Sequence, residues 1–185
     1  MRIESNWKEA ALLRALANGA QSKAVLRALK KAGSSGSKAL RAAANRAVRA
    51  RKRLPVAVVN ESIRPVVSSG STISDLSWNV RVSGRPFRVS DYKYRQIKRG
   101  VSVAINKGKP RSLIEGAFVA RVGKHVGVFR RVGKARLPIK ELYTSRVTDV
   151  FKDAGTTPAV LGRGREVFDA TFKRVLPLEL KKRSA

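Results

Sequence analysis

The chain has no cysteine and only one histidine among its 185 residues. Without thiols there can be no disulfide framework and no thiolate zinc site, and a single histidine disfavours a histidine cage around a metal. Acidic residues are also scarce, with 12 Asp and Glu against 41 Lys and Arg. Clustered carboxylates that could hold catalytic metal ions are therefore not expected. We expect neither an enzyme nor a cofactor-binding protein.

Long apolar runs are missing as well. No stretch approaches the roughly 18 apolar residues that a membrane-spanning helix needs, and residues 1–8 lack the apolar run of a secretory signal. We expect a protein that is neither exported by that route nor inserted in a membrane. Large aromatic side chains are few, with six Phe, three Tyr and two Trp, so the core is expected to be modest and completed by neighbouring subunits.

Positive charge is what the chain has in excess. Residues 10–60 contain 12 Lys and Arg and no acid, and residues 10–140 contain 30 bases and four acids, which places 26 of the 29 net charges there. Such a field attracts polyanions and speeds their encounter with the protein. It indicates a class of partner and carries no information about the fold.

The first 66 residues are predicted to form a basic helical region. Helical spacing of apolar residues predicts helices over residues 5–19, 22–32, 37–54 and 55–64. The Gly33-Ser-Ser-Gly36 segment is predicted to break the chain between the second and third helices, and Pro65 to end the fourth.

Residues 67–185 are predicted to form an antiparallel sheet followed by helices. Apolar residues alternate with polar ones from residue 76 to residue 131 and predict a meander of about five strands. Helices are expected over residues 145–155, capped by Ser145, and from Thr157-Pro158 to residue 175. The fold class is therefore α+β, with the helical region packed on the sheet as one structural unit.

The helix over residues 37–54 is the strongest candidate site, because its basic arc lies opposite an alanine-rich apolar stripe. A merely solvated helix would intersperse both signs of charge, so the missing acids favour contact with a phosphate backbone or an acidic protein. A second candidate is a basic hairpin loop, for which an ordinary exposed turn is equally compatible. The predicted contacts are Lys38, Arg41, Arg46, Arg49, Lys52 and Arg53 on the helix, and Lys107, Lys109 and Arg111 in the hairpin.

Three weaker signals favour structural roles. Tyr92 and Tyr94, interleaved with basic residues, could stack bases, but core packing is the preferred interpretation. His125 lies in a predicted turn with no second ligand nearby in sequence. The Gly162-Arg-Gly164 segment lacks the lysine and serine of a phosphate-binding loop and is interpreted as an irregular start to the last helix.

Several short segments resemble a known family. Gly116-Ala-Phe-Val-Ala120, Val128-Phe-Arg-Arg131 and Arg136-Leu-Pro-Ile139, followed by Glu141-Leu142, are similar to the carboxy-terminal core of the tailed-phage minor tail protein Z family, the tail-completion proteins. Upstream, Ala43-Ala-Asn45-Arg46 in an alanine-rich helix also resembles that family, and the likeness extends over residues 21–180. The motif residues are Gly116, Phe118, Phe129, Arg131, Leu137, Pro138 and Ile139.

This resemblance implies a structural virion protein. It implies a subunit that forms a ring of six at the head-proximal end of a phage tail, the neck, and joins tail to head after assembly in the host cytoplasm. Its implied partners are further copies of itself, the adjoining tail-terminator and head-tail connector proteins, and double-stranded DNA in the channel. The basic helix would face either that DNA or the acidic rim of an adjoining ring.

A second hypothesis comes from composition alone. Small, cysteine-free, Lys- and Arg-rich chains are common among ribosomal and nucleoid-type nucleic-acid-binding proteins. Such a protein would bind nucleic acid tightly as an isolated monomer and in a salt-sensitive manner. A tail-completion subunit should instead form or join rings and bind free DNA weakly.

Overall fold

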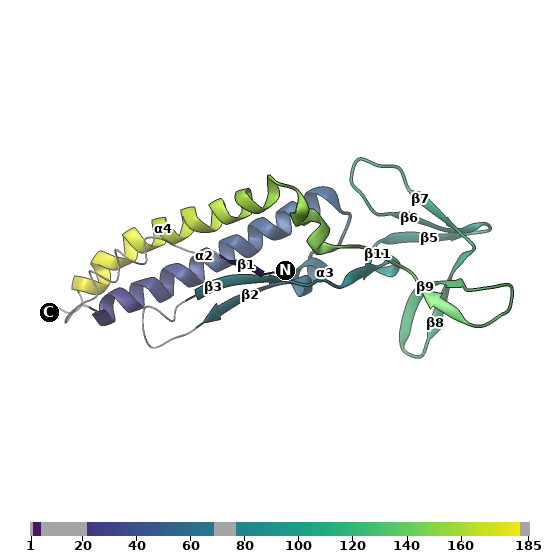
Figure 1. Cartoon of the computed structure of the whole chain (residues 1–185), viewed down its shortest axis with the longest axis horizontal. Coiled ribbons are helices and arrows are strands. Elements are labelled where there is room, and N and C mark those ends of the chain that lie inside the picture. The colour runs from purple at the N-terminus through teal and green to yellow at the C-terminus, as the bar shows by residue number, and fades with distance from the viewer. Residues whose placement is uncertain (1, 5–21, 69–76, 182–185) are drawn as a thin grey trace. The chain divides into compact units, whose positions relative to one another are not determined.

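The computed structural model describes residues 2–4, 22–68 and 77–181 (Figure 1). The chain divides into two compact units, one drawn from residues 1–44, 63–82 and 153–185, the other from residues 45–62 and 83–152. Helices and antiparallel strands are both present, so the predicted α+β class is confirmed. The helix predicted over residues 5–19 lies outside the described residues.

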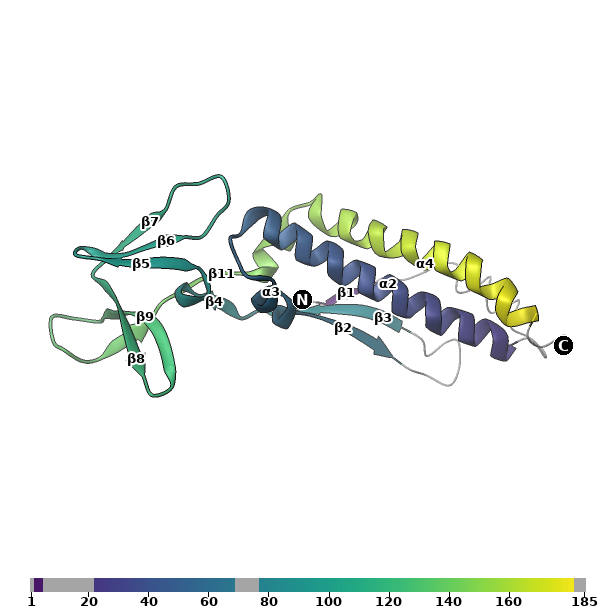
Figure 2. The same cartoon turned by 180° about the vertical axis from the view of Figure 1, so that it is seen from behind.

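The first unit pairs two long helices with a small sheet. Helix α2 (Ser22–Arg51), whose last turns belong to the second unit, runs beside α4 (Thr156–Lys181) in both views (Figures 1 and 2). The sheet has the order β1-β3-β2, built from β1 (Arg2–Glu4), β2 (Ile63–Ser68) and β3 (Ser77–Val82). The two helices are antiparallel, since Leu40 meets Gly164 whereas Lys31 binds Glu179 near the end of α4.

Apolar side chains from both helices form the core of this unit. Val25, Leu29 and Ala32 of α2 pack against Phe168 of α4, with Phe172 and Leu176 beside them. The rings of Phe168 and Phe172 are stacked, with centroids 6.1 Å apart. Burying a Leu or Phe side chain contributes about 1.5–3 kcal/mol, so this seam is a main source of stability for the helix pair.

The predicted helix break at residues 33–36 is wrong. Helix α2 continues through it, and the Ser37 hydroxyl, expected to cap a new helix, donates instead to the Gly33 carbonyl at 2.7 Å. A Cβ on Gly36 would lie 3.1 Å from Phe168 Cβ and 3.2 Å from the Gly164 carbonyl oxygen. Glycine costs about 1 kcal/mol in a helix, but here it permits α4 to approach closely, and tertiary packing outweighs propensity.

The irregular start predicted at residues 162–164 is also wrong. Helix α4 already begins at Thr156, with Pro158 in its first turn as expected. Gly164 is buried, and a Cβ there would lie 2.8 Å from Leu40 Cδ1. The second glycine is therefore the counterpart of Gly36 at the same helix crossing.

The segment after α2 differs from the prediction in its second half. Helix α2 ends at Arg51, and a short helix α3 (Val56–Ser62) follows. Ile63 and Pro65, predicted to finish that helix, begin β2, where they pair with Val82 and Val80 of β3. β2 lies at the edge of its sheet. An edge strand tolerates proline, because the missing backbone N–H need not pair with a second neighbouring strand.

The second unit holds three small antiparallel sheets, so the predicted single sheet of about five strands is wrong. One sheet has the order β5-β6-β7, another β10-β9-β8, and the third pairs β11 with β4. Their strands are β4 (Pro86–Arg88), β5 (Lys93–Ile97), β6 (Gly100–Ala104), β7 (Ser112–Glu115), β8 (Ala117–Val122), β9 (His125–Arg131), β10 (Ile139–Glu141) and β11 (Tyr143–Arg146). Gly116, with φ +67°, turns the chain between β7 and β8, so β8 starts a new sheet instead of extending the first.

The core of the second unit is rich in valine and confirms the structural interpretation of Tyr92. Val101, Val103 and Val128 are fully buried, and Tyr92 is buried with its ring edge-on to Phe87. Burial raises the pKa of Tyr92, although a hydrogen bond with Thr144 partly offsets this.

Instead of the helix predicted over residues 145–155, a 3-10 helix, η3 (Val147–Lys152), buries Val147, Val150 and Phe151, and a second short one, η2 (Val89–Asp91), precedes Tyr92. At the start of η3 the Asp149 carboxylate accepts a hydrogen bond from the Arg146 amide at 2.9 Å. This bond lies where a helix cap by Ser145 was predicted.

A polar cluster ties β10 and β11 to β9. His125 Nε2 donates to Glu141 Oε1 at 2.7 Å, and the Tyr143 hydroxyl donates to Oε2 at 3.0 Å. Arg88 Nε lies 3.8 Å from the same carboxylate. Burial alone would raise the pKa of Glu141, but the hydrogen bonds from His125 and Tyr143 and the nearby positive charge outweigh it, so the pKa lies below its ordinary value.

The glycines of α4 give a matched stability test. We expect Gly164→Ala to destabilise the protein by about 1–3 kcal/mol, because the added methyl group clashes with Leu40. Gly162 lies in the same helix, and a Cβ added there would have no neighbouring atom within 4 Å. Gly162→Ala should therefore stabilise the protein by about 0.5–1 kcal/mol through helix propensity. Urea unfolding of the two variants provides the measurement. Stabilisation by both substitutions would contradict close packing at Gly164.

The Glu141 cluster gives a pH-dependent prediction. A carboxylate with a lowered pKa stabilises the fold above its unfolded-state pKa, and this contribution is lost as pH falls through the folded-state pKa. Glu141→Gln should therefore cost about 1–2 kcal/mol at pH 7, and the difference from wild type should shrink below about pH 4.5. Urea unfolding at pH 7 and pH 3 measures both values. Glu115→Gln, which breaks the exposed pair with Arg99, is the control and should have little effect.

Candidate nucleic-acid interface

The basic arc predicted on the chain's main helix lies on α2 and just beyond its end. Positions 38 and 49, and positions 41 and 52, are each 11 residues apart, which is about three helical turns, so the four lie along one side. Four of the six predicted side chains are exposed, whereas Arg41 and Lys52 are half-buried. On the opposite side Leu40, Ala44 and Val48 are buried, which confirms the predicted apolar stripe.

Helix α2 contains nine Lys and Arg residues and no acid. Arg49 and Arg51 lie in its last turn, where the helix dipole favours positive charge. This accounts for bases at the carboxyl end on structural grounds. It does not account for the bases further up the helix, which have no acid on α2 to pair with.

The end of α2 is joined to the turn after β6. The Lys107 amide donates to the Arg51 carbonyl at 2.9 Å, and the Arg53 amide donates to the Ile105 carbonyl at 2.9 Å. Between them Lys52 Nζ donates to Asn106 Oδ1 at 2.8 Å. The basic helix and the basic hairpin, which are the two candidate sites, therefore meet in the second unit. Lys52 and Asn106, which join them, are 54 residues apart in the sequence. We call the combined basic surface of Arg49, Lys52, Arg53, Lys107 and Lys109 the junction surface.

Burial and nearby charges at the junction surface shift the pKa of Lys52. Burial lowers the pKa of Lys52; the Asp149 carboxylate acts in the opposite direction, and the Lys109 ammonium lowers it further. The Asp149 carboxylate and the Lys109 ammonium therefore act on the charged form of Lys52 in opposite directions. A bound phosphate or carboxylate would act on Lys52 in the same direction as Asp149 and favour its charged form.

Arg111 has a different role from the other predicted contacts. Its guanidinium donates to the Ser102 carbonyl at 3.0 Å, to the Ser102 hydroxyl at 3.1 Å and to the Lys93 carbonyl at 3.2 Å. These bonds fasten the end of the hairpin to β5 and β6. Asn106, which holds Lys52 in place, was not predicted, and no sequence spacing points to it.

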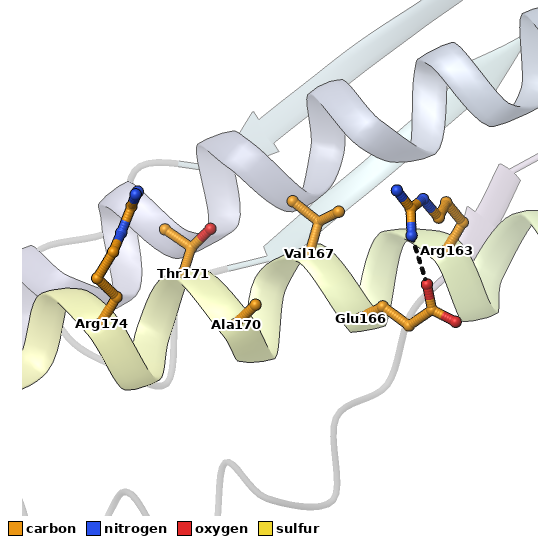
Figure 3. A pocket seen from close by; sticks show the side chains of 6 residues that line it. All are labelled: Arg163, Glu166, Val167, Ala170, Thr171 and Arg174. Carbon is orange, nitrogen blue, oxygen red and sulfur yellow. Dashed lines mark hydrogen bonds and ion pairs between the residues drawn. The ribbon is translucent and has the colours of Figure 1, made fainter.

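The outer side of α4 shows what an ordinary solvated helix looks like in this chain. Arg163 pairs with Glu166 at 2.8 Å, and Arg165 lies 3.7 Å from Asp169. Figure 3 shows the side chains along a shallow groove of about 480 Å³, with both signs of charge among them: Arg163, Glu166, Val167, Ala170, Thr171 and Arg174. The absence of such pairs within α2 is thus a local property of that helix.

Neither a metal site nor a membrane span is found within residues 2–4, 22–68 and 77–181. These residues hold no cluster of three or more His, Asp or Glu side chains that could bind a metal ion. Their helices are also not long and apolar enough to cross a bilayer. His125, interpreted as structural from the sequence, belongs to the Glu141 cluster.

The family-motif residues lie together in the β10-β9-β8 sheet and its loop. Phe118 pairs with Phe129, and Ile139 pairs with Arg131, so the alternation of strands puts these four side chains on one face. The two rings are 6.5 Å apart, and the Arg131 guanidinium lies 5.4 Å from the centre of the Phe118 ring. Leu137 and Pro138, joined by a cis peptide bond, lead into β10, and Gly116 leads into β8.

Comparison with known proteins agrees with this motif. The family described as prophage minor tail protein Z matches residues 9–180, nearly the whole chain. No curated protein and no solved structure matches the chain significantly. The match includes both α2 and the β10-β9-β8 sheet. The chain therefore belongs to the prophage minor tail protein Z family and is a structural component of the bacteriophage tail.

Proposed function

We propose that this protein is a ring-forming tail-completion subunit at the neck of the virion, where it joins tail to head and surrounds the DNA channel. Six copies form the ring, next to the tail-terminator and head-tail connector proteins. The basic arc of α2, together with the junction surface, faces the DNA. Its role is structural and involves no catalysis.

The observation that carries this proposal is the absence of acids from α2 combined with the junction surface. Five bases from two distant segments gather in one unit, where the charge of Lys109 disfavours the charged form of Lys52 and Asp149 acts against this effect. Like-charged subunits in a ring would also repel one another, because the screening length of about 8 Å at physiological salt leaves close contacts partly unscreened. Phosphates in a central channel would offset both costs.

Charge reversal on α2 provides the test. We expect Arg46, Arg49 and Arg53 changed together to Glu to abolish DNA retention in assembled particles. For the isolated chain, the log-log salt slope of its weak binding to duplex DNA should fall by roughly three, at about 0.9 per lost phosphate contact. Particle DNA content and salt-dependent binding are the measurements. Lys173, Arg174 and Lys181 changed to Glu on α4 make the same change in net charge and should affect neither.

Three results would contradict the proposed orientation or function. Normal DNA retention with failed tail joining would place an acidic neighbouring ring, rather than DNA, against α2. Tight, salt-sensitive binding by the isolated monomer, with no ring in the particle, would favour the nucleoid-type hypothesis. Equal effects of the α2 and α4 variants would show that net charge alone, without a defined face, governs binding.

A further inference from the structure

Helix α2 and the residue after it carry a repeat of eleven residues. Three segments each place an alanine after one base and a second base three residues beyond the first: Arg27-Ala-Leu-Lys30, Lys38-Ala-Leu-Arg41 and Arg49-Ala-Arg-Lys52. Eleven residues make about three turns of an α-helix and a rise of about 16.5 Å. The three pairs of bases therefore follow one another along the same side of the helix, and we call these six residues the basic stripe.

The basic stripe depends on the continuity of α2. A break at residues 33–36, as the sequence predicted, would separate the first pair of bases from the other two and remove their common alignment. Helix α2 instead runs unbroken from Ser22 to Arg51. Ser34 and Asn45 occupy the places on the stripe between the pairs, and the helix holds no acid. The stripe is therefore made of bases and uncharged polar residues.

Helix packing explains the interval of the repeat but not its charge. Leu29 and Leu40, which are also eleven residues apart, are buried, so the repeat keeps the apolar side of α2 aligned with its neighbours. Arg27, Lys38 and Arg49 are exposed, and packing would be satisfied by any polar residue at these places. The regular return of a base points to a partner with regularly spaced negative charge.

The spacing fits B-form DNA that lies parallel to the helix. Arg27 and Arg49 are 22 residues apart, which is about 33 Å along α2. One turn of the duplex is about 34–36 Å long, so a line parallel to its axis meets the same strand again after that distance. The other strand crosses the line in between, where Lys38 lies. The grooves differ in width, so this crossing is not at the midpoint, and the long Lys38 side chain can bridge the difference.

We propose that the basic stripe lies along the axis of a B-form duplex, with Arg27 and Arg49 on one strand and Lys38 on the other. This adds the amino-terminal half of α2 to the contact and sets the direction of the helix relative to the DNA. Single-stranded nucleic acid fits less well, since it lacks this pitch and α2 has no aromatic side chain on which bases could stack. An acidic protein surface has no fixed repeat of this length. The inference rests on the proposed function in one respect, that the partner is duplex DNA.

Double photocrosslinking of the full chain bound to duplex DNA tests this geometry. Photoreactive residues at positions 27 and 49 of one chain should attach to the same strand about 10 nucleotides apart, which is one helical turn. A photoreactive residue at position 38 should attach to the opposite strand. Only the separation of the attachment points is measured, so the chain may bind anywhere along the DNA. Separations of about five nucleotides or fewer would show that α2 crosses the duplex and would overturn the proposal.

Alanine variants compare the two halves of the helix. Arg27→Ala, Lys38→Ala and Arg49→Ala should each lower the log-log salt slope of duplex binding by about 0.9, because each removes one phosphate contact. Lys173→Ala removes an exposed base from α4 and should leave the slope unchanged. Alanine favours the helix, so thermal unfolding of the variants should match wild type or exceed it.

The outcomes separate this inference from the proposed function. A lower slope for Arg49→Ala alone would overturn the inference, because the contact would then be confined to the end of α2, and the proposed function would stand. Crosslinks with the expected separation on free duplex, but none to DNA in assembled particles, would support the inference and count against the proposed function alone.

Discussion

Unbalanced positive charge is the constraint on which the rest of this structure depends. Helix α2 has no acid with which to form the pairs seen on α4, and the turn after β6 adds two more lysines at its end. Such charge raises the free energy of the isolated chain, and desolvation makes this worse where Lys52 is partly buried. A partner that brings negative charge lowers that free energy, so the surface is adapted to an assembly.

The packing of the helices makes the charged arc possible. The apolar side of α2 is built from alanines, valines and leucines that pack closely, and Gly36 and Gly164 allow α2 and α4 to approach. This close contact supplies stability that the basic side does not. The opposite arc is thereby free to carry arginine and lysine without loss of the helix.

The sequence predicted the periodic features of the fold well and the long-range ones poorly. The basic arc, the apolar stripe and the hairpin of β8 and β9 all follow from local spacing and are present. The glycines were misinterpreted as breaks because their role depends on a helix more than 120 residues away. Likewise, the meeting of Lys52 with Asn106 depends on tertiary pairing that no local pattern encodes. The motif residues were found by resemblance alone, and only strand register shows that four of them share a face.

This arrangement concentrates positive charge on one surface, formed by the arc of α2 and the junction surface. Cryo-electron microscopy of intact virions would test the account most directly. It should show this chain as a ring at the head-proximal end of the tail, with Arg46, Arg49 and Arg53 toward the DNA. Density for the chain at the far end of the tail, or a ring whose α2 arc faces solvent, would contradict it.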